Sequence, residues 1–216
     1  DDEYGRRLLR IYGKKCLSFG LDSTRHHDVQ LQNFYMTLSE LSMKVQFFNS
    51  DPIDITLPLT GRFNIYNALG AMAICYKMGV APLVIKKGLE SMPQVPGRLE
   101  KYFFENEVCG VVDYAHTPDA LENVLSALRE VCHGKIISVF GHGGERYQAN
   151  RPLLGQVAAR LADIIIVTMD NSRSEDPAKI AEAIEQGIAS VVEAPPHYRI
   201  LDRNEAVRTA LSMAKP

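Results

Sequence analysis

Four short polar clusters, each placed after an apolar run, hold the side chains best suited to chemistry. Together they carry three aspartates, two histidines and three arginines, at 113–116, 141–146, 170–173 and 202–203. An arginine guanidinium group binds a planar carboxylate or phosphate through two parallel hydrogen bonds. The clusters therefore predict a site for an anionic ligand.

Some of these residues also have a simpler structural explanation. Asp202 is better explained as a helix cap, and Arg203 and Arg151 as solvated surface charges. The glycine-rich stretch 141–144 can simply turn the chain, and His142 fits a structural role as well as a functional one. The first and third clusters are harder to reduce to caps and turns, so a ligand role is favoured there.

The elements that must position these clusters follow from an alternating pattern in the second half of the chain. Apolar runs at 108–113, 136–140, 164–168 and 198–201 alternate with helical patterns at 118–131, 151–161, 177–191 and 203–213. The interior runs lack polar alternation, which indicates strands buried on both faces and a parallel sheet of right-handed βαβ units. The carboxyl ends of such strands line the ligand crevice.

The first half of the chain reads differently. Short strand patterns at 16–20, 29–36, 43–48 and 53–57 are joined by short links, which favour antiparallel pairing, and helical patterns follow at 64–78 and 82–90. The stiff stretch 93–97 contains two prolines and a glycine. We therefore expect domains at 1–93 and 94–216 and an α/β fold: a Rossmann-like, mostly parallel sheet with flanking helices, preceded by a β-rich and helical segment.

Composition excludes several classes of protein. The 216 residues carry 24 Lys+Arg and 26 Asp+Glu, and this balance argues against a nucleic-acid binder. No apolar run reaches the ~18 residues that a membrane span needs, and the acidic start is unlike a signal peptide. We therefore expect a cytoplasmic protein with no membrane partner.

Familiar motifs for phosphate loops, dinucleotide binding and hydrolase nucleophiles are missing from the sequence. The four cysteines form no C-x-x-C pair, and the ligand-like His26-His27-Asp28 has no partner cluster at metal-site spacing. No metal ligand is therefore assigned.

Seven motifs, taken in order, resemble the Mur ligases, and most closely the diaminopimelate-adding MurE type. The resemblance spans nearly the whole chain, and seven motifs in order are highly specific where any one alone is weak. They are Asp2–Leu8, Gly61–Ala68, Pro96–Arg98, Asp113–Leu121, Phe140–Arg146, Arg151–Pro152 and Asp170–Pro177.

The resemblance implies an ATP-dependent amide ligase of peptidoglycan synthesis that works through an acyl phosphate. Its substrates are small molecules: ATP, UDP-MurNAc-L-Ala-D-Glu and meso-diaminopimelate. It implies that 1–93 is the end of the central ATP-binding domain and 94–216 most of the C-terminal domain. The family's phosphate loop and main Mg²⁺ ligands would lie upstream, so we expect no catalytic residue here, an inactive fragment and a monomer.

The same resemblance assigns roles to individual residues. Asn64 and Asn67 match asparagines that face the adenine of ATP. Arg98 and Asp113 match residues near the ribose and phosphates, and the loop that holds Tyr114 and His116 lies beside the nucleotide. Arg146 matches an arginine that binds the carboxylate of diaminopimelate. Asp170, Asn171 and Arg173 match the motif that selects diaminopimelate over lysine.

Four departures from the family pattern concern the amino-acid pocket. Ser172 replaces the usual proline, His142 stands where cysteine is common, Glu145 replaces aspartate, and Tyr147–Asn150 replaces a charged stretch. Two alternatives stay open. One is another Mur-like ligase, either lysine-adding or of the cyanophycin or folylpolyglutamate synthetase type. The other is a non-catalytic module that senses a nucleotide or an amino acid.

Overall fold

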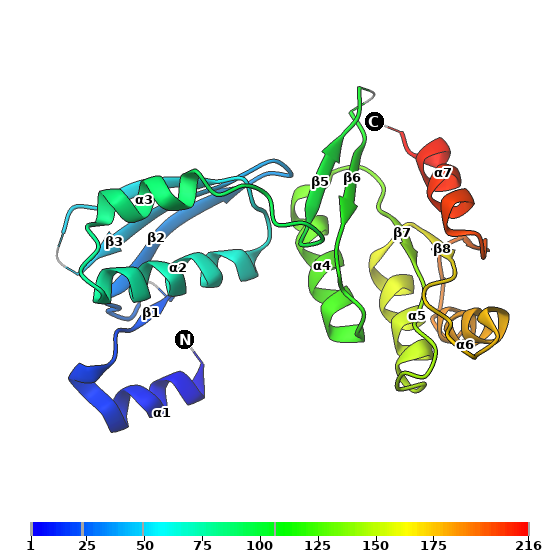
Figure 1. Ribbon diagram of the computed structural model, residues 1–216, viewed down its shortest axis with the longest axis horizontal. Coiled ribbons are helices and arrows are strands. Elements are labelled where there is room, and N and C mark those ends of the chain that lie inside the picture. The colour runs from blue at the N-terminus through cyan, green and yellow to red at the C-terminus, as the bar shows by residue number, and fades with distance from the viewer. Residues whose placement is uncertain (1, 23, 49, 106, 216) are drawn as a thin grey trace. The chain divides into compact units, whose positions relative to one another are not determined.

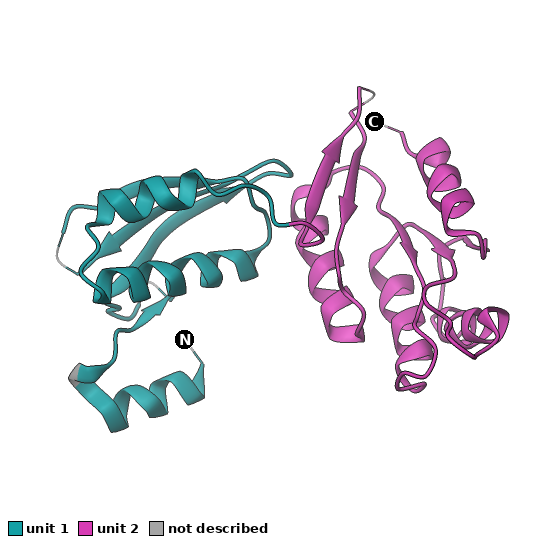
Figure 2. Ribbon diagram, viewed as in Figure 1, with its two compact units in different colours: residues 1–95 teal, residues 96–216 magenta. Residues whose placement is uncertain are grey.

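A computed structural model describes residues 2–22, 24–48, 50–105 and 107–215. Contacts divide the chain into two compact units, Asp1–Val95 and Pro96–Pro216 (Figure 2). The division falls two residues after the boundary expected from the prolines and glycine at 93–97. Each unit has its own hydrophobic core.

The first unit is built on a four-stranded sheet in the order β1 (Phe19–Gly20), β2 (Val29–Met36), β3 (Leu41–Phe47) and β4 (Ile53–Leu57). The expected antiparallel pairing is confirmed for β2, β3 and β4. It is wrong for β1, which runs parallel to β2. The Asp28 carboxylate accepts hydrogen bonds from the Ser18 amide at 2.7 Å and its hydroxyl at 2.9 Å, and so fixes this return of the chain.

Helices cover one face of this sheet. Alternate residues of β3 are buried, from Leu41 to Phe47, because a strand turns every second side chain to the same face. Helices α2 (Arg62–Lys77) and α3 (Pro82–Glu90) pack against that face (Figure 1). The sequence analysis missed α1 (Glu3–Tyr12), which is capped by Asp2 and has no buried residue, and a short 3-10 helix follows at Gly13–Lys15.

The second unit contains a three-stranded parallel sheet, β7 (Ile137–Phe140), β8 (Ile164–Val167) and β9 (His197–Arg199). The expected α/β class is confirmed, and so is parallel pairing for the last three apolar runs. Four helices accompany these strands: α4 (Pro118–Val131), α5 (Asn150–Leu161), α6 (Pro177–Ala189) and α7 (Arg203–Met213).

The first apolar run does not join this sheet. Among the described residues, β6 (Cys109–Val112) pairs only with β5 (Glu100–Phe103), in an antiparallel ribbon that the sequence analysis did not predict. A short loop closes the ribbon, with the Phe104 amide donating to the Val108 carbonyl at 2.9 Å. Closing such a short loop costs little entropy, so the nearest strand becomes the partner.

The central strand β8 is covered on both faces, as its apolar run predicted, whereas all three residues of the edge strand β9 are exposed. Ile165 and Val167 point into the cluster formed with α5 and α6, while Ile166 points to the opposite face, and all three are 0% exposed. Helix α7 contacts β7 and β8, and its Ala206 is also fully buried (Figure 1).

Two glycines let α5 and α6 touch through their backbones. A Cβ on Gly187 would lie 1.9 Å from the Pro152 carbonyl oxygen, and one on Gly155 would lie 2.1 Å from the Ile184 carbonyl oxygen. No side chain fits at either position, so the start of α5 is held directly against α6.

Side chains cap three helices of this unit. Thr117, Asp176 and Asp202 each accept a hydrogen bond from an amide in the first turn of α4, α6 and α7. Asp202 is therefore a cap, as its position indicated. Arg203 is exposed, and its guanidinium donates to the Met169 carbonyl at 3.3 Å.

Candidate functional site

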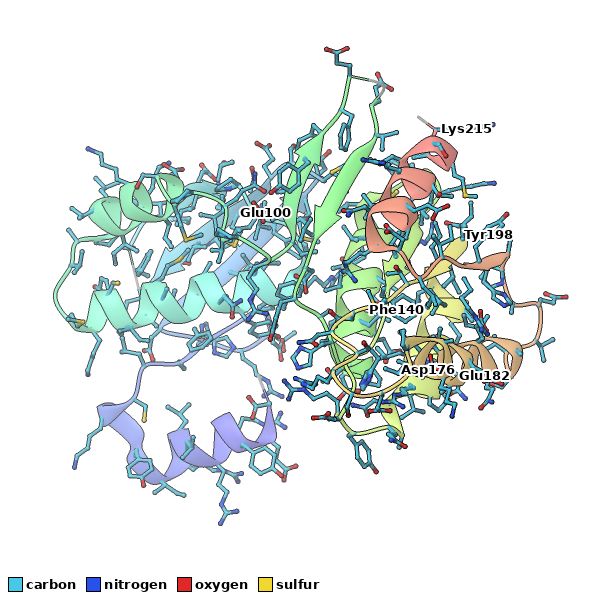
Figure 3. The ribbon with its side chains drawn as sticks, turned by 45° about the vertical axis from the view of Figure 1, so that its right-hand side comes forward. Glu100, Phe140, Asp176, Glu182, Tyr198 and Lys215 are labelled. Atoms are coloured by element: carbon cyan, nitrogen blue, oxygen red, sulfur yellow. The ribbon has the colours of Figure 1, made fainter. Side chains whose placement is uncertain are left out.

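Two loops lie against each other at the carboxyl ends of β7 and β8. The first is the 141–146 loop, which follows β7, and the second is the 170–175 loop, which follows β8 and leads into α6. Figure 3 labels two residues that flank them, Phe140 and Asp176. The Gly144 amide donates to the Asn171 carbonyl at 2.8 Å, and the Arg173 guanidinium donates to the Gly144 carbonyl.

Two glycines of the 141–146 loop are required by close backbone contacts. A Cβ on Gly141 would lie 2.1 Å from the Thr168 carbonyl oxygen, and one on Gly144 would lie 1.9 Å from the Ser172 carbonyl oxygen. Real Cβ contacts do not reach such distances, so a larger residue would push the loops apart. These glycines do more than turn the chain.

The carboxylates of two glutamates accept hydrogen bonds that join the loops. The Glu145 amide donates to the carboxylate of Glu175, and the Ser174 hydroxyl donates to the carboxylate of Glu145 at 2.6 Å. The amide hydrogen bond from Glu145, followed by the pair with Arg151, lowers the pKa of Glu175. The hydrogen bonds from Ser174 lower the pKa of Glu145.

Arg151 lies beneath these loops and is 5% exposed, so the expectation of a solvated surface charge was wrong. Its Nη2 atom donates to both carboxylate oxygens of Glu175, at 2.9 and 2.8 Å. A buried guanidinium group needs such a partner, because desolvating an unpaired charge is costly. Sequence reasoning missed this pair because the two residues lie 24 positions apart.

His142 is buried beside this pair, at 5% exposed, and its Nδ1 atom has no hydrogen-bond partner. It lines a shallow hollow with Thr168, Met169, Asp170 and Ser172. Burial disfavours the imidazolium form, and the nearby Arg151 cation adds to this, so the pKa of His142 lies below its ordinary value. The ring is therefore neutral at physiological pH.

The structure brings Arg146 and Arg173 to the same place. A Cβ on Gly143 would lie 3.5 Å from both Cγ of Arg146 and Nη1 of Arg173, so the two side chains flank this glycine. Both arginines are exposed. The Asn171 side chain accepts a hydrogen bond from the Arg173 amide at 3.3 Å, while Asp170 is exposed at the edge of the hollow.

A second group of predicted residues forms a separate cluster at the start of this unit. The Asp113 carboxylate accepts hydrogen bonds from the Leu99 and Ala115 amides, both at 2.8 Å. It therefore ties two turns together. The Arg98 guanidinium lies 5.5 Å from the centre of the Tyr114 ring, and the His116 ring meets that ring edge-on at 5.1 Å.

Arg98, Tyr114 and His116 are exposed, whereas Asp113 is half-buried. An exposed arginine can bind a phosphate, and an exposed aromatic ring can stack on a base. This cluster therefore has the chemistry that a nucleotide requires.

The remaining predicted residues lie in the first unit, in the first turns of α2. The Asn64 side-chain amide donates to the Thr60 carbonyl at 2.7 Å, and the Asn67 side-chain amide donates to the Asn64 side-chain oxygen at 3.1 Å. Asn64 is half-buried and Asn67 is exposed. The pair presents amide groups in a fixed arrangement, which suits recognition of a base edge.

Groups of three or more His, Cys, Asp or Glu side chains arranged to hold a metal ion do not occur among the described residues. Within the same part of the chain, none of the helices is long and apolar enough to cross a membrane.

Residues 97–216 match the family described as "Mur ligase, glutamate ligase domain", and residues 1–75 match "Mur ligase middle domain". Two relatives named UDP-N-acetylmuramoyl-L-alanyl-D-glutamate–2,6-diaminopimelate ligase cover 100% of the chain. The one from Clostridium botulinum is 38% identical over 222 residues, and the one from Synechocystis is 44% identical over 221 residues. The chain spans 44% and 42% of their lengths, respectively.

A solved structure of a ligase with the same name is also similar. It has a TM-score of 0.67 and 30% sequence identity, and the match covers 92% of this chain and 40% of that one.

Proposed function

The chain belongs to the Mur ligase family, and from that premise we propose that it is part of an ATP-dependent ligase of peptidoglycan precursor synthesis. The ligase adds meso-diaminopimelate to UDP-MurNAc-L-Ala-D-Glu through an acyl phosphate. One observation carries the choice of amino acid: Arg146 and Arg173 flank the same glycine, Gly143, at the carboxyl ends of β7 and β8.

The proposed domain assignment follows the two units. The unit that ends at Val95 is the last part of the ATP-binding domain, and the unit from Pro96 is the greater part of the C-terminal domain. The match of residues 1–75 to a middle domain and of 97–216 to a glutamate ligase domain supports this assignment.

The amino-acid site is proposed to read both charges at the side-chain end of diaminopimelate. Arg146 and Arg173 hold the carboxylate, and Asp170 and Asn171 face the ammonium group. Lysine has the ammonium group but lacks this carboxylate. It would leave the arginine pair without an anion, and sites built around such groups discriminate strongly against the analogue that lacks the partner.

The nucleotide site is proposed to use the Arg98, Tyr114 and His116 cluster, with Asp113 holding its two turns and Asn64 and Asn67 facing the adenine. ATP supplies the phosphoryl group that activates the substrate carboxylate. We assign no metal ligand to the described residues of this chain. The main Mg²⁺ ligands are expected in the remainder of the ligase.

Binding to the 216-residue chain tests the amino-acid assignment. We expect meso-diaminopimelate to bind at least about tenfold more tightly than L-lysine in calorimetric or NMR titrations. Arg173→Ala removes this preference, whereas Arg160→Ala, an exposed arginine on α5, preserves it. Tighter binding of lysine would favour a lysine-adding ligase instead.

A non-catalytic sensor is the alternative from a different class. Part of a ligase, lacking a group to hold the γ-phosphate, should form no amide by itself. ATP-dependent amide formation by the 216 residues alone would contradict the proposed division of labour. A Gly-Lys-Thr phosphate loop encoded upstream of Asp1 would support the ligase, and an unrelated start there would support the sensor. We further propose that the ligase is a cytoplasmic monomer.

A further inference from the structure

We propose that the Arg151–Glu175 ion pair is a positioning device for the amino-acid site, which holds the 141–146 and 170–175 loops so that Arg146 and Arg173 stand side by side. This inference rests on the proposed function and deepens it. Neither Arg151 nor Glu175 is placed against the substrate. Both act through the two arginines.

The ion pair links the two elements that carry the loops. Arg151 lies in the first turn of α5, the helix that follows the 141–146 loop, and Glu175 directly precedes Asp176, the cap of α6. The side chains are 6% and 24% exposed, and both carboxylate oxygens accept from one guanidinium nitrogen. Since α5 and α6 already touch through Gly155 and Gly187, the pair fixes the ends of two packed helices at the rim.

Glu175 also reaches across to the opposite loop. Its carboxylate accepts from the Glu145 amide, and the Glu145 carboxylate accepts from Ser174. Glu145 directly precedes Arg146, and Ser174 directly follows Arg173. In each loop, therefore, the residue beside the arginine is bound by a side chain of the other loop. A displacement of Glu175 would be transmitted to both arginines.

The backbone at this point needs such support. Glu145 and Arg173 have φ angles of 54° and 50°, a left-handed conformation that side chains other than glycine rarely adopt. Residues stay in such conformations only where the surrounding contacts hold them. Here the contacts that hold them are the hydrogen bonds of Glu175, Ser174 and Gly144.

A similar ion pair elsewhere in the unit provides a matched control. Arg129 of α4 binds Asp163 at 2.6 Å at the amino end of β8, with side chains 40% and 38% exposed. Arg129 also donates to the Leu161 and Gly134 carbonyls, and the Asp163 carboxylate accepts from the Ile136 amide. None of these residues belongs to the two loops. Loss of this pair should affect stability without changing how the loops are placed.

The experiment compares Glu175→Gln with Asp163→Asn in the 216-residue chain, by NMR titration with meso-diaminopimelate and with L-lysine. We expect Glu175→Gln to weaken diaminopimelate binding about tenfold while lysine binding changes little, because displaced arginines lose the carboxylate contact. Asp163→Asn should keep the wild-type preference.

The outcomes separate the inference from the proposed function. If the wild-type chain does not prefer diaminopimelate, the proposed function is wrong. If the wild type prefers it and Glu175→Gln keeps both the fold and the preference, the positioning role is wrong. Should Glu175→Gln fail to fold, Ser174→Ala removes the reciprocal contact without touching the ion pair. A reduced preference supports the role, and an unchanged one overturns it.

Discussion

An ion pair between an arginine and a carboxylate lies at each end of strands β7 and β8, but the two ion pairs differ in their surroundings. At the amino end, Arg129 and Asp163 are 40% and 38% exposed. At the carboxyl end, Arg151 and Glu175 are 6% and 24% exposed, and the loops around them carry the candidate site. The same kind of ion pair is therefore solvated at the amino end and largely buried at the carboxyl end.

This difference separates structural from functional pairing. An exposed pair gains little free energy because water and salt screen it. A buried pair is costly to break, because removing one partner leaves the other charge desolvated. The carboxyl end therefore depends on its ion pair in a way that the amino end does not.

The largest expected effect comes from removing the two arginines in turn. Arg151→Met should lower the unfolding midpoint markedly and abolish diaminopimelate binding, because the loops lose their anchor. Arg129→Met should change the free energy of unfolding by no more than about 1 kcal/mol. Thermal unfolding and ligand titration measure both. Equal losses in the two variants would remove the distinction between the ends.

A smaller effect is expected from adding one methyl group at each end. Gly144→Ala places a Cβ 1.9 Å from the Ser172 carbonyl oxygen, so the loops must separate. We expect a loss of about 1–3 kcal/mol in the free energy of unfolding, together with weaker diaminopimelate binding. Gly134→Ala meets no atom within 4 Å and should stay within about 0.5 kcal/mol of wild type in urea unfolding. A neutral Gly144→Ala would show that the loops are not in close contact.

The two ends should also respond differently to pH. The pKa of His142 is lowered from 6.5 by burial and by Arg151, so the unfolded chain binds the proton more readily. The stability that this provides is complete above pH 6.5 and is lost as the pH falls through the depressed pKa, by at most about 1.4 kcal/mol per unit. His142→Gln should abolish that slope, whereas His133→Gln, an exposed histidine that follows α4, should preserve it.

The smallest expected effect concerns the exposed ion pair between Arg129 and Asp163. Although burial opposes ionisation, hydrogen bonds from Arg129 and the Ile136 amide keep the pKa of Asp163 below its ordinary value. A double-mutant cycle on Arg129 and Asp163 should give a coupling of less than about 1 kcal/mol that shrinks further in about 1 M salt, where screening is strong. A coupling that is large and independent of salt would mean that this pair, too, behaves as buried.

Local patterns predicted much of the second unit. The apolar runs predicted β7 and β8 because buried strands need apolar side chains on both faces, and Asp202 was correctly predicted as the cap of α7. The β5–β6 ribbon was missed because strand pairing depends on which partner lies nearest in space. A helix with no buried residue, α1, gave no core-facing stripe to recognise.

For the candidate site, the sequence located the loops but not their support. Arg146 and Arg173 could be named from motif positions, and the structure brings them beside Gly143. Arg151 was misread as a surface charge, because an arginine near a helix start normally faces water. Only the fold brings Arg151 into hydrogen-bond contact with Glu175, which lies 24 residues away in the sequence.

The contact of α5 and α6 through Gly155 and Gly187 also constrains motion. Loops on a flexible base fluctuate separately within nanoseconds to microseconds. Here each loop precedes one of two helices whose backbones touch, so neither loop can move far alone without separating the helices. We expect any opening of the amino-acid site to be a collective movement of microseconds to milliseconds, detectable by relaxation dispersion as one shared exchange rate for Gly143 and Asn171.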